Sequence, residues 1–157
     1  EIYLKVITDS LGILSYQVEY RNTINLYDIN IIAEDFYKSF LNLVYKYNLM
    51  NLNTIDKNAS AIDLGDKGKK VAIQVTSDNT STKIKKTIDK FIENKLYEKY
   101  YRLVILILTS KKSYTTEFDT KEKFDFDKSL PMKIQLNSLA LINFHSVIFF
   151  VHGHDLI

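Results

Sequence analysis

The spacing of apolar residues divides the chain into helical and extended stretches. Residues 2–20 and 28–47 place apolar side chains three and four positions apart, which is typical of amphipathic helices. Gly12 weakens the first helix, and residues 22–25 separate the two. Asp28 is the predicted N-cap of the second helix. The apolar stripe expected on that helix is Ile29, Ile32, Phe36, Phe40, Leu43 and Tyr47.

The middle of the chain predicts two strands, a helix and a third strand. Residues 60–65 and 70–77 form short runs around a tight turn, which is typical of a β-hairpin. A helix over 81–99 follows a group of helix-start residues. Residues 103–108 are all apolar, as in a central strand that is covered on both faces. Because short connections join strand, helix and strand, we expect a parallel crossover.

The last third of the chain is less regular. Residues 111–129 are charged and aromatic without a clear period, 136–144 predict a short helix, and 147–151 predict another buried strand. The predicted fold class is therefore α/β, with a mixed sheet flanked by helices. We divide the chain into a domain over 1–144 and a segment over 145–157, which is either a buried strand or the start of a following domain.

Composition and charge narrow the function classes. The 157 residues fit one domain, and 46% hydrophobic with 25% charged residues is typical of soluble globular proteins. The net charge of +2 is small for a nucleic-acid-binding domain, so such binding would rest on a local patch. The absence of cysteine excludes disulfides and fits a cytoplasmic protein. No signal peptide or membrane-spanning run is visible, so no membrane partner is expected.

The hairpin carries the clearest candidate chemistry. If its turn centres on Lys67 and Gly68, Asp63 lies opposite Ala72 and diagonal to Gln74. The acid and the amide would then share one face at about 7–8 Å. Burying such groups costs free energy unless a partner satisfies them, so the pair marks a candidate site. The structural alternatives are that Asp63 ties a loop and that Gln74 is a satisfied polar residue of a partly exposed strand.

Several short stretches resemble one known family. They are Asp28-Ile29-Asn30-Ile31-Ile32-Ala33-Glu34, Asn51-Leu52-Asn53, Ala61-Ile62-Asp63-Leu64, Ile73-Gln74-Val75-Thr76-Ser77, and Lys83-Ile84 with Thr87 and Phe91. Together they resemble the N-terminal SMEK domain of bacterial proteins. The resemblance covers roughly residues 20–110, with a domain core expected over about 26–110. It implies a role in bacterial conflict and anti-phage defence.

The predicted order of elements also resembles the restriction-endonuclease-like, or PD-(D/E)XK, superfamily. Its core is a helix, a strand meander, a helix and a strand. This resemblance implies that Glu34 is the acid of the first helix, Asp63 the metal-binding aspartate and Gln74 the second acidic position, where some members have glutamine. The chain departs from the pattern at Thr76, where the superfamily usually has its catalytic lysine. Lys83, on the following helix, is expected to substitute for it.

The chemistry that follows from this resemblance is phosphodiester hydrolysis with Mg²⁺ or Mn²⁺, which prefer oxygen ligands. The expected ligands are oxygens of Asp63, Glu34, Gln74 and the main chain of Val75. Lys83, Lys85 and Lys86 open the third helix, where positive charge opposes the helix dipole, and we expect them to contact phosphate. The alternatives are that Lys83 is a solvated surface lysine and that Glu34 lies on a solvated helix flank.

Two function classes follow from these residues. The first is a nuclease-fold domain of a bacterial defence protein, which cleaves nucleic acid, DNA rather than RNA. The second is a catalytically silent module that binds nucleic acid or protein, or that forms a homodimer and regulates a fused or associated effector. Thr76 and the modest net charge favour the second class.

The end of the chain carries a shorter resemblance. The strand over 147–151, followed by His152, His154 and Asp155, resembles the opening strand and loop of TIR-like nucleotide-binding domains. This resemblance makes the segment the start of a following domain. A metal site is the alternative for these residues. Because Asp155 follows His154 directly, the spacing departs from that of metallo-hydrolases, and we interpret the segment as a terminus.

Overall fold

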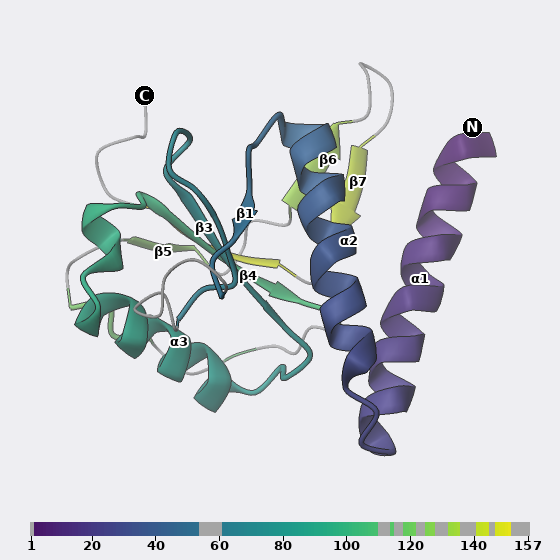
Figure 1. The fold of residues 1–157 in the computed structure, drawn as a ribbon, viewed down its shortest axis with the longest axis horizontal. Helices are drawn as coiled ribbons and strands as arrows, with labels where there is room; N and C mark the ends of the chain where they lie inside the picture. The colour runs from purple at the N-terminus through teal and green to yellow at the C-terminus, as the bar shows by residue number, and fades with distance from the viewer. Residues whose placement is uncertain are drawn as a thin grey trace.

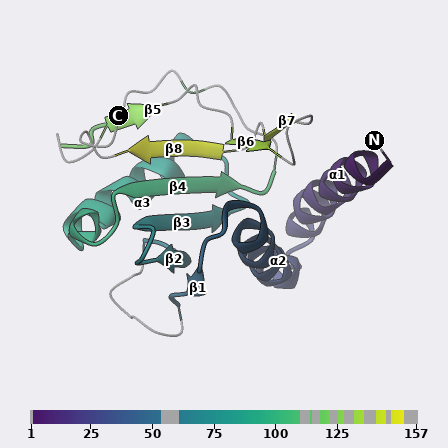
Figure 2. The same ribbon diagram turned by 90° about the horizontal axis from the view of Figure 1, so that it is seen from above.

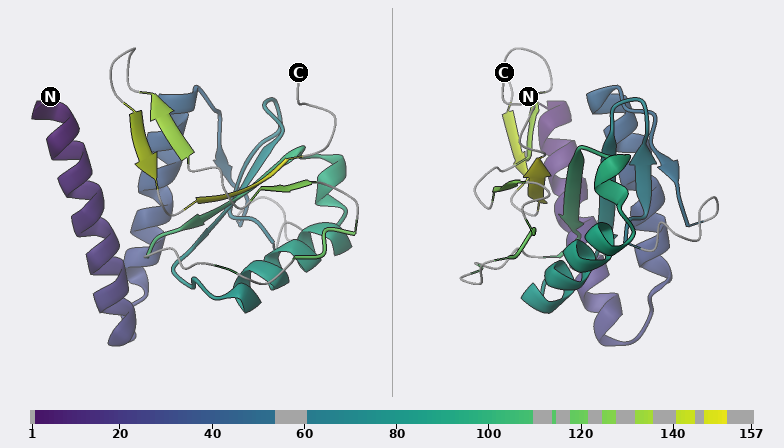
Figure 3. Two further views of the ribbon diagram at one scale, coloured as in Figure 1. Left: turned by 180° about the vertical axis from the view of Figure 1, so that it is seen from behind. Right: turned by 90° about the vertical axis from the view of Figure 1, so that its left-hand side faces the viewer.

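The computed structural model describes residues 2–53, 61–109, 114, 118–121, 125–127, 132–135, 141–144 and 147–151. Its helices are α1 (Ile2–Thr23), α2 (Asp28–Tyr45) and α3 (Ser81–Glu93), and a 3₁₀ turn, η1 (Leu96–Glu98), follows α3. Figure 1 shows α1 and α2 side by side at one side of the sheet and α3 across the other side. Figure 3 shows α1 at the margin of the molecule, next to α2.

Six strands form the main sheet in the order β1-β2-β3-β4-β8-β5, as Figure 2 shows from above. Their bounds are Met50–Asn51 (β1), Leu64–Asp66 (β2), Val71–Thr76 (β3), Arg102–Ile107 (β4), Val147–Val151 (β8) and Asp125–Asp127 (β5). Strands β3 and β4 are parallel, and the other neighbours are antiparallel. A separate pair is formed by β6 (Met132–Gln135) and β7 (Leu141–Phe144). The chain is therefore α/β with a mixed sheet, as the sequence predicts.

Strand β4 separates two apolar cores. Its residues alternate between them: Leu103, Ile105 and Ile107 pack with α3, while Val104 and Leu106 pack with α2. Strands that are buried on both faces carry continuous apolar runs because both sets of side chains leave water. The predictions of a doubly covered central strand and of a parallel crossover are confirmed.

Helix α2 buries a different face from the predicted one. The side chains against the sheet are Ile29, Ala33, Tyr37 and Leu41, one row at four-residue spacing. Three members of the predicted stripe, Ile32, Phe36 and Leu43, are 58%, 41% and 69% exposed. Ala33 and Tyr37, which the predicted stripe left out, pack instead in the apolar core with residues of β2, β3 and β4. The N-cap prediction is also wrong, because Tyr27 occupies that position without a side-chain cap and Asp28 is the first helical residue.

Three further boundaries differ from prediction. The first hairpin strand begins at Leu64 rather than at residue 60, and residues 54–60 lie outside the described part. Helix α3 ends at Glu93, because Lys95 adopts a left-handed conformation with φ of 52°. The predicted helix over 136–144 is wrong for Leu141–Phe144, which pair with β6 as a strand. Its first five residues lie outside the described part.

The C-terminal strand prediction is confirmed, since β8 pairs with β4 and with β5 in the main sheet. The TIR-like loop and the alternative metal site at His152, His154 and Asp155 lie outside the described residues. Among the described helices, none combines the length and the apolar character that a membrane span requires.

Candidate functional site

Asp63 and Gln74 are bonded to each other at the end of the hairpin. The ladder pairs Leu64 with Ile73 and Gly65 with Ala72, so the predicted position of Asp63 opposite Ala72 is wrong. The Gln74 Nε2 donates to Asp63 Oδ2 at 2.6 Å. The prediction that the two side chains share one side of the hairpin is confirmed, and they are closer than the diagonal spacing suggested.

The Asp63 carboxylate accepts three hydrogen bonds. Besides Gln74, the backbone N–H of Val75 donates to its Oδ2 at 2.7 Å, and Asn53 Nδ2 donates to its Oδ1 at 3.3 Å. Burial raises the pKa of Asp63, while the bond from Val75 and the charge of Lys83 act in the opposite direction. An aspartate with these partners also stabilises the end of the hairpin, so the loop-tying interpretation and the site interpretation are both compatible with the contacts.

The side-chain amide of Gln74 bridges two oxygens. Gln74 is 7% exposed, and its Nε2 donates both to Asp63 Oδ2 and to the main-chain oxygen of Val75, the latter at 3.1 Å. A carboxylate oxygen and a peptide oxygen are ligand types that Mg²⁺ and Mn²⁺ accept. The amide nitrogen therefore contacts two of the four expected metal ligands, Asp63 and the main-chain oxygen of Val75.

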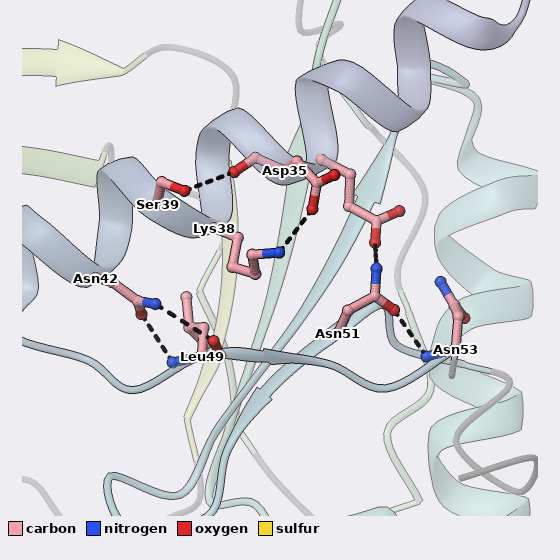
Figure 4. Close-up of polar contacts among 8 residues, drawn as sticks. Asp35, Lys38, Ser39, Asn42, Leu49, Asn51 and Asn53 are labelled. Atoms are coloured by element: carbon pink, nitrogen blue, oxygen red, sulfur yellow. Dashed lines mark hydrogen bonds and ion pairs between the residues drawn. The ribbon is translucent and has the colours of Figure 1, made fainter. Parts of the chain in front are cut away.

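Glu34 reaches the same region from α2. Its Oε1 accepts a hydrogen bond from Asn51 Nδ2 at 2.6 Å, and Asn51 Oδ1 accepts one from the backbone N–H of Asn53 at 3.0 Å (Figure 4). Burial, followed by the charge of Asp63, raises the pKa of Glu34 from 4.5 to about 7. The two carboxyl groups are thus electrostatically coupled, and Glu34 exchanges its proton near neutral pH. It is not a fully solvated flank residue.

Asn51 and Asn53 connect the two acids, and the sequence analysis did not assign them to the site. One asparagine donates to Glu34 and the other to Asp63. Their spacing of two residues at and after β1 was the available signal, because it places two side chains on one side of an extended chain.

The lysines at the start of α3 differ in their surroundings. The backbone N–H of Lys83 donates to the N-cap Thr80 Oγ1 at 3.2 Å, and its charge lowers the pKa of Asp63. Lys85 is exposed and pairs with Asp89 at 2.6 Å, and Lys86 is exposed on the same helix. Lys83 is therefore electrostatically coupled to Asp63, whereas Lys85 pairs with a residue of its own helix.

Thr76 ends β3 in place of a lysine. It is 8% exposed, and its hydroxyl accepts a hydrogen bond from the backbone N–H of Asp78 at 3.1 Å. This contact forms part of the turn that leads into α3. Within the described residues, no three His, Cys, Asp or Glu side chains come together as a metal site. Cation binding here would thus require amide and main-chain oxygens as well as the two acids.

The family model of the SMEK domain matches residues 6–140. The match extends well beyond the stretches that carry the resemblance, and it includes both helices of the α1–α2 hairpin and both ends of β3. No curated protein and no solved structure matches the chain. Because the family model spans most of the sequence, the chain belongs to the SMEK domain family.

Proposed function

We propose that this domain has a restriction-endonuclease-like core and acts as a metal-dependent phosphodiesterase on DNA, within a bacterial defence protein. The observation that carries the proposal is the position of the Gln74 amide nitrogen. It bridges Asp63 Oδ2, which also accepts the Val75 backbone N–H, and the main-chain oxygen of Val75, two oxygens of the kind that a hard cation binds. In this conformation the Gln74 amide N–H takes the position between these oxygens where a cation would bind.

The donor set fits Mg²⁺ or Mn²⁺ after one local change. Rotation of the Gln74 amide by half a turn replaces its nitrogen with Oε1, which converts a donor into an acceptor. The residues that would hold the ion are then Asp63, Gln74, Val75 and Glu34. When bound, such an ion supplies an activated water and stabilises developing charge on phosphate. Because a metal requires an ionised carboxylate, binding is expected to strengthen as pH rises through the Glu34 pKa of about 7.

In this proposal, Lys83 provides the positive charge beside the metal ligands. Its charge already acts on Asp63, and the N-cap Thr80 fixes the start of its helix. In the proposed reaction Lys83 contacts the substrate phosphate and orients the attacking water. Lys86 remains available for a more distant phosphate, and Lys85 must first leave Asp89.

A cleavage assay tests the proposal directly. Plasmid, single-stranded DNA and RNA are incubated with the protein and Mn²⁺, Mg²⁺ or EDTA. We expect metal-dependent cleavage of DNA that falls at least about a hundredfold in Asp63→Asn. The matched control Asp9→Asn, on the exposed surface of α1, should cleave like the wild type. Cleavage that is unchanged in Asp63→Asn would refute the site, and absence of cleavage with every metal would refute the activity.

A second function is favoured by the surface of the α1–α2 hairpin. Among the residues whose burial is described, the exposed large apolar side chains other than Met50 and Tyr101 all lie on α1, on α2 or on their connection. Tyr16, Ile31 and Leu43 are each more than two thirds exposed. Clustered apolar surface of this kind is typical of interaction sites. We therefore propose, as the alternative, a silent module that forms a homodimer through this hairpin and positions an effector.

Sedimentation velocity distinguishes this alternative. A homodimer should dissociate when Ile31→Glu and Leu43→Glu are combined, because two charges would be buried in the interface. The matched control is Glu substitution at Ser39 of α2 and Gln17 of α1, which are exposed polar positions. A wild-type protein that stays monomeric at every concentration would contradict the homodimer.

A further inference from the structure

We propose that the turn of the β2–β3 hairpin and the start of β4 form a second site, which binds single-stranded nucleic acid through its phosphates and bases. The residues of this turn site are Lys46, Tyr47, Lys67, Lys69, Lys70, Tyr101 and Arg102. None of them belongs to the candidate metal site, so the turn site does not depend on the proposed hydrolysis.

Two adjoining hollows define the turn site. One, of about 490 Å³, lies between the end of α2 and the turn, and its lining includes Lys46, Lys67 and Lys69. The other, of about 400 Å³, is lined by Lys69, Lys70, Arg102 and two tyrosines. The hollows share Gly68 and Lys69. A continuous surface therefore runs around both sides of the turn.

The lining of these hollows is strongly cationic. Asp66 is the one acid among their lining residues, and its oxygens accept the backbone N–H groups of Asn48 at 2.6 Å and Lys69 at 2.9 Å. In the described part of the chain, the ion pairs lie elsewhere, on α1, α2 and α3. Five cations thus face one surface with a single, hydrogen-bonded acid, which favours a polyanionic ligand.

Aromatic rings lie among these cations. The Lys70 ammonium is 3.8 Å from the centroid of the Tyr101 ring, and Tyr101 is 39% exposed. Tyr47 stacks on Tyr45 with centroids 5.3 Å apart, and Arg102 Nη1 lies 3.5 Å from the Tyr47 hydroxyl. Alternating cations and aromatic faces bind single strands, because phosphates contact the charges and bases stack on the rings. Duplex DNA, whose bases are already stacked on one another, would contact the cations through its phosphates but would not stack on the tyrosines.

Two of these lysines lie where the chain changes direction. Lys46 is the C-cap of α2, with φ of 55°, and Lys70, with φ of 53°, directly precedes β3. Lys46 lines one hollow and Lys70 lines the other. The two chain turns therefore bring cations from separate elements to the same surface.

The turn site lies at the opposite end of β3 from Asp63 and Gln74. The strand begins at Val71, directly after the turn, and Gln74, which lies level with Asp63, is about 10 Å from Val71 along an extended chain. The two sites share no residue. This separation allows binding and hydrolysis to be tested one without the other.

Fluorescence anisotropy with a labelled twelve-nucleotide oligothymidylate, in EDTA, measures binding without cleavage. We expect Lys69→Glu/Lys70→Glu to weaken binding about tenfold or more and to reduce the salt dependence. The control Lys5→Glu/Lys90→Glu changes net charge equally and should bind like the wild type. Tyr101→Ala should weaken binding about fivefold or more if bases stack there. Circular dichroism of each variant establishes that the fold is retained.

The outcomes separate this inference from the proposed function. Equal binding by the Lys69→Glu/Lys70→Glu protein and its control overturns the turn site, whatever the cleavage assay gives. Equal affinity for inorganic polyphosphate, together with no effect of Tyr101→Ala, overturns nucleic acid as the ligand. Weaker binding by the Lys69→Glu/Lys70→Glu protein than by its control supports the turn site even if no metal-dependent cleavage is found.

Discussion

The two ends of β3 carry opposite charge, and they differ in how strongly that charge is coupled to folding. At one end, Asp63 and Glu34 are partly buried, accept hydrogen bonds from side-chain amides, and have raised pKa values. At the other end, the lysines of the turn stay at the surface and face solvent-filled hollows. Burying an acid costs free energy, so the ionisation of these acids should make stability depend on pH. Surface cations, in contrast, can be substituted with little effect on folding.

The largest expected effect comes from a third carboxylate at the acidic end. Gln74→Glu removes the amide donor and places another charge beside Asp63 and Glu34, so we expect the free energy of unfolding to fall by about 3 kcal/mol without metal. Mn²⁺ should restore much of that loss, because it binds the folded state. Urea unfolding with and without Mn²⁺ measures both effects.

Gln17→Glu makes the same chemical change on the exposed face of α1 and serves as its control. It should leave the free energy of unfolding nearly unchanged and insensitive to Mn²⁺. If Gln74→Glu behaves in the same way, the acidic end is not coupled to folding, and the contrast with the turn disappears.

Gly65 pairs with Ala72 of β3, between the acids and the turn, and its substitution should destabilise both regions. A Cβ at this position would lie 2.7 Å from Leu52 Cδ1 and 2.7 Å from the Tyr100 hydroxyl. Overpacking of this kind should lower the free energy of unfolding of Gly65→Ala by about 1–3 kcal/mol. Gly12→Ala on α1, where nothing lies within 4 Å, should instead stabilise by about 0.5–1 kcal/mol. Thermal unfolding that shows no difference between the two variants would contradict the packing at Gly65.

The pH dependence of stability should report Glu34. Its folded-state pKa is raised from 4.5 to about 7, so the folded protein retains this proton to higher pH than the unfolded chain. The contribution of this proton to the free energy of unfolding is complete below pH 4.5, is lost as pH rises towards 7, and is absent above pH 7. After allowance for solvent screening, we expect the free energy of unfolding to fall by about 1–2 kcal/mol over this pH range.

Urea unfolding at pH 5.5 and pH 8 measures this difference. Glu34→Gln should remove most of it, and Glu19→Gln on the exposed face of α1 should retain it. A wild-type stability that rises with pH over this interval would show that Glu34 is not buried among acids.

The smallest expected effect lies at the start of α3. Thr80 Oγ1 accepts the Lys83 backbone N–H, so Thr80→Ala should lower the free energy of unfolding by about 1 kcal/mol. It should also lower any Lys83-dependent cleavage, because the first turn of the helix frays. Thr82→Ala, an exposed neighbour within the helix, is the control. Equal stability of the two variants, measured by thermal unfolding, would exclude the cap.

Local patterns predicted the elements, and the sequence could not predict how they face each other. The doubly apolar run of β4 and the hairpin follow from residues adjacent in sequence. The hairpin turn comprises the four residues between the paired Asp66 and Val71, so it centres on Gly68 and Lys69, and Gly65 rather than Asp63 lies opposite Ala72. The residue types of the turn did not distinguish this centre from the predicted one at Lys67 and Gly68.

The candidate site was predictable where it lies on one element. Asp63 and Gln74 were found from the hairpin alone. Glu34 was placed in the site by resemblance, and its coupling to Asp63 depends on which face of α2 meets the sheet. Asn51 was missed because its role, a bond to an acid seventeen positions earlier, exists only in the folded chain.

Titration calorimetry with Mn²⁺ at pH 8 tests the central claim most directly. This pH lies above the Glu34 pKa of about 7, and we expect that the wild type binds one ion per chain, that Asp63→Asn binds none, and that Asp9→Asn binds like the wild type. Equal binding by the wild type and Asp63→Asn, or no binding by the wild type, would contradict a metal site at the acidic end of β3.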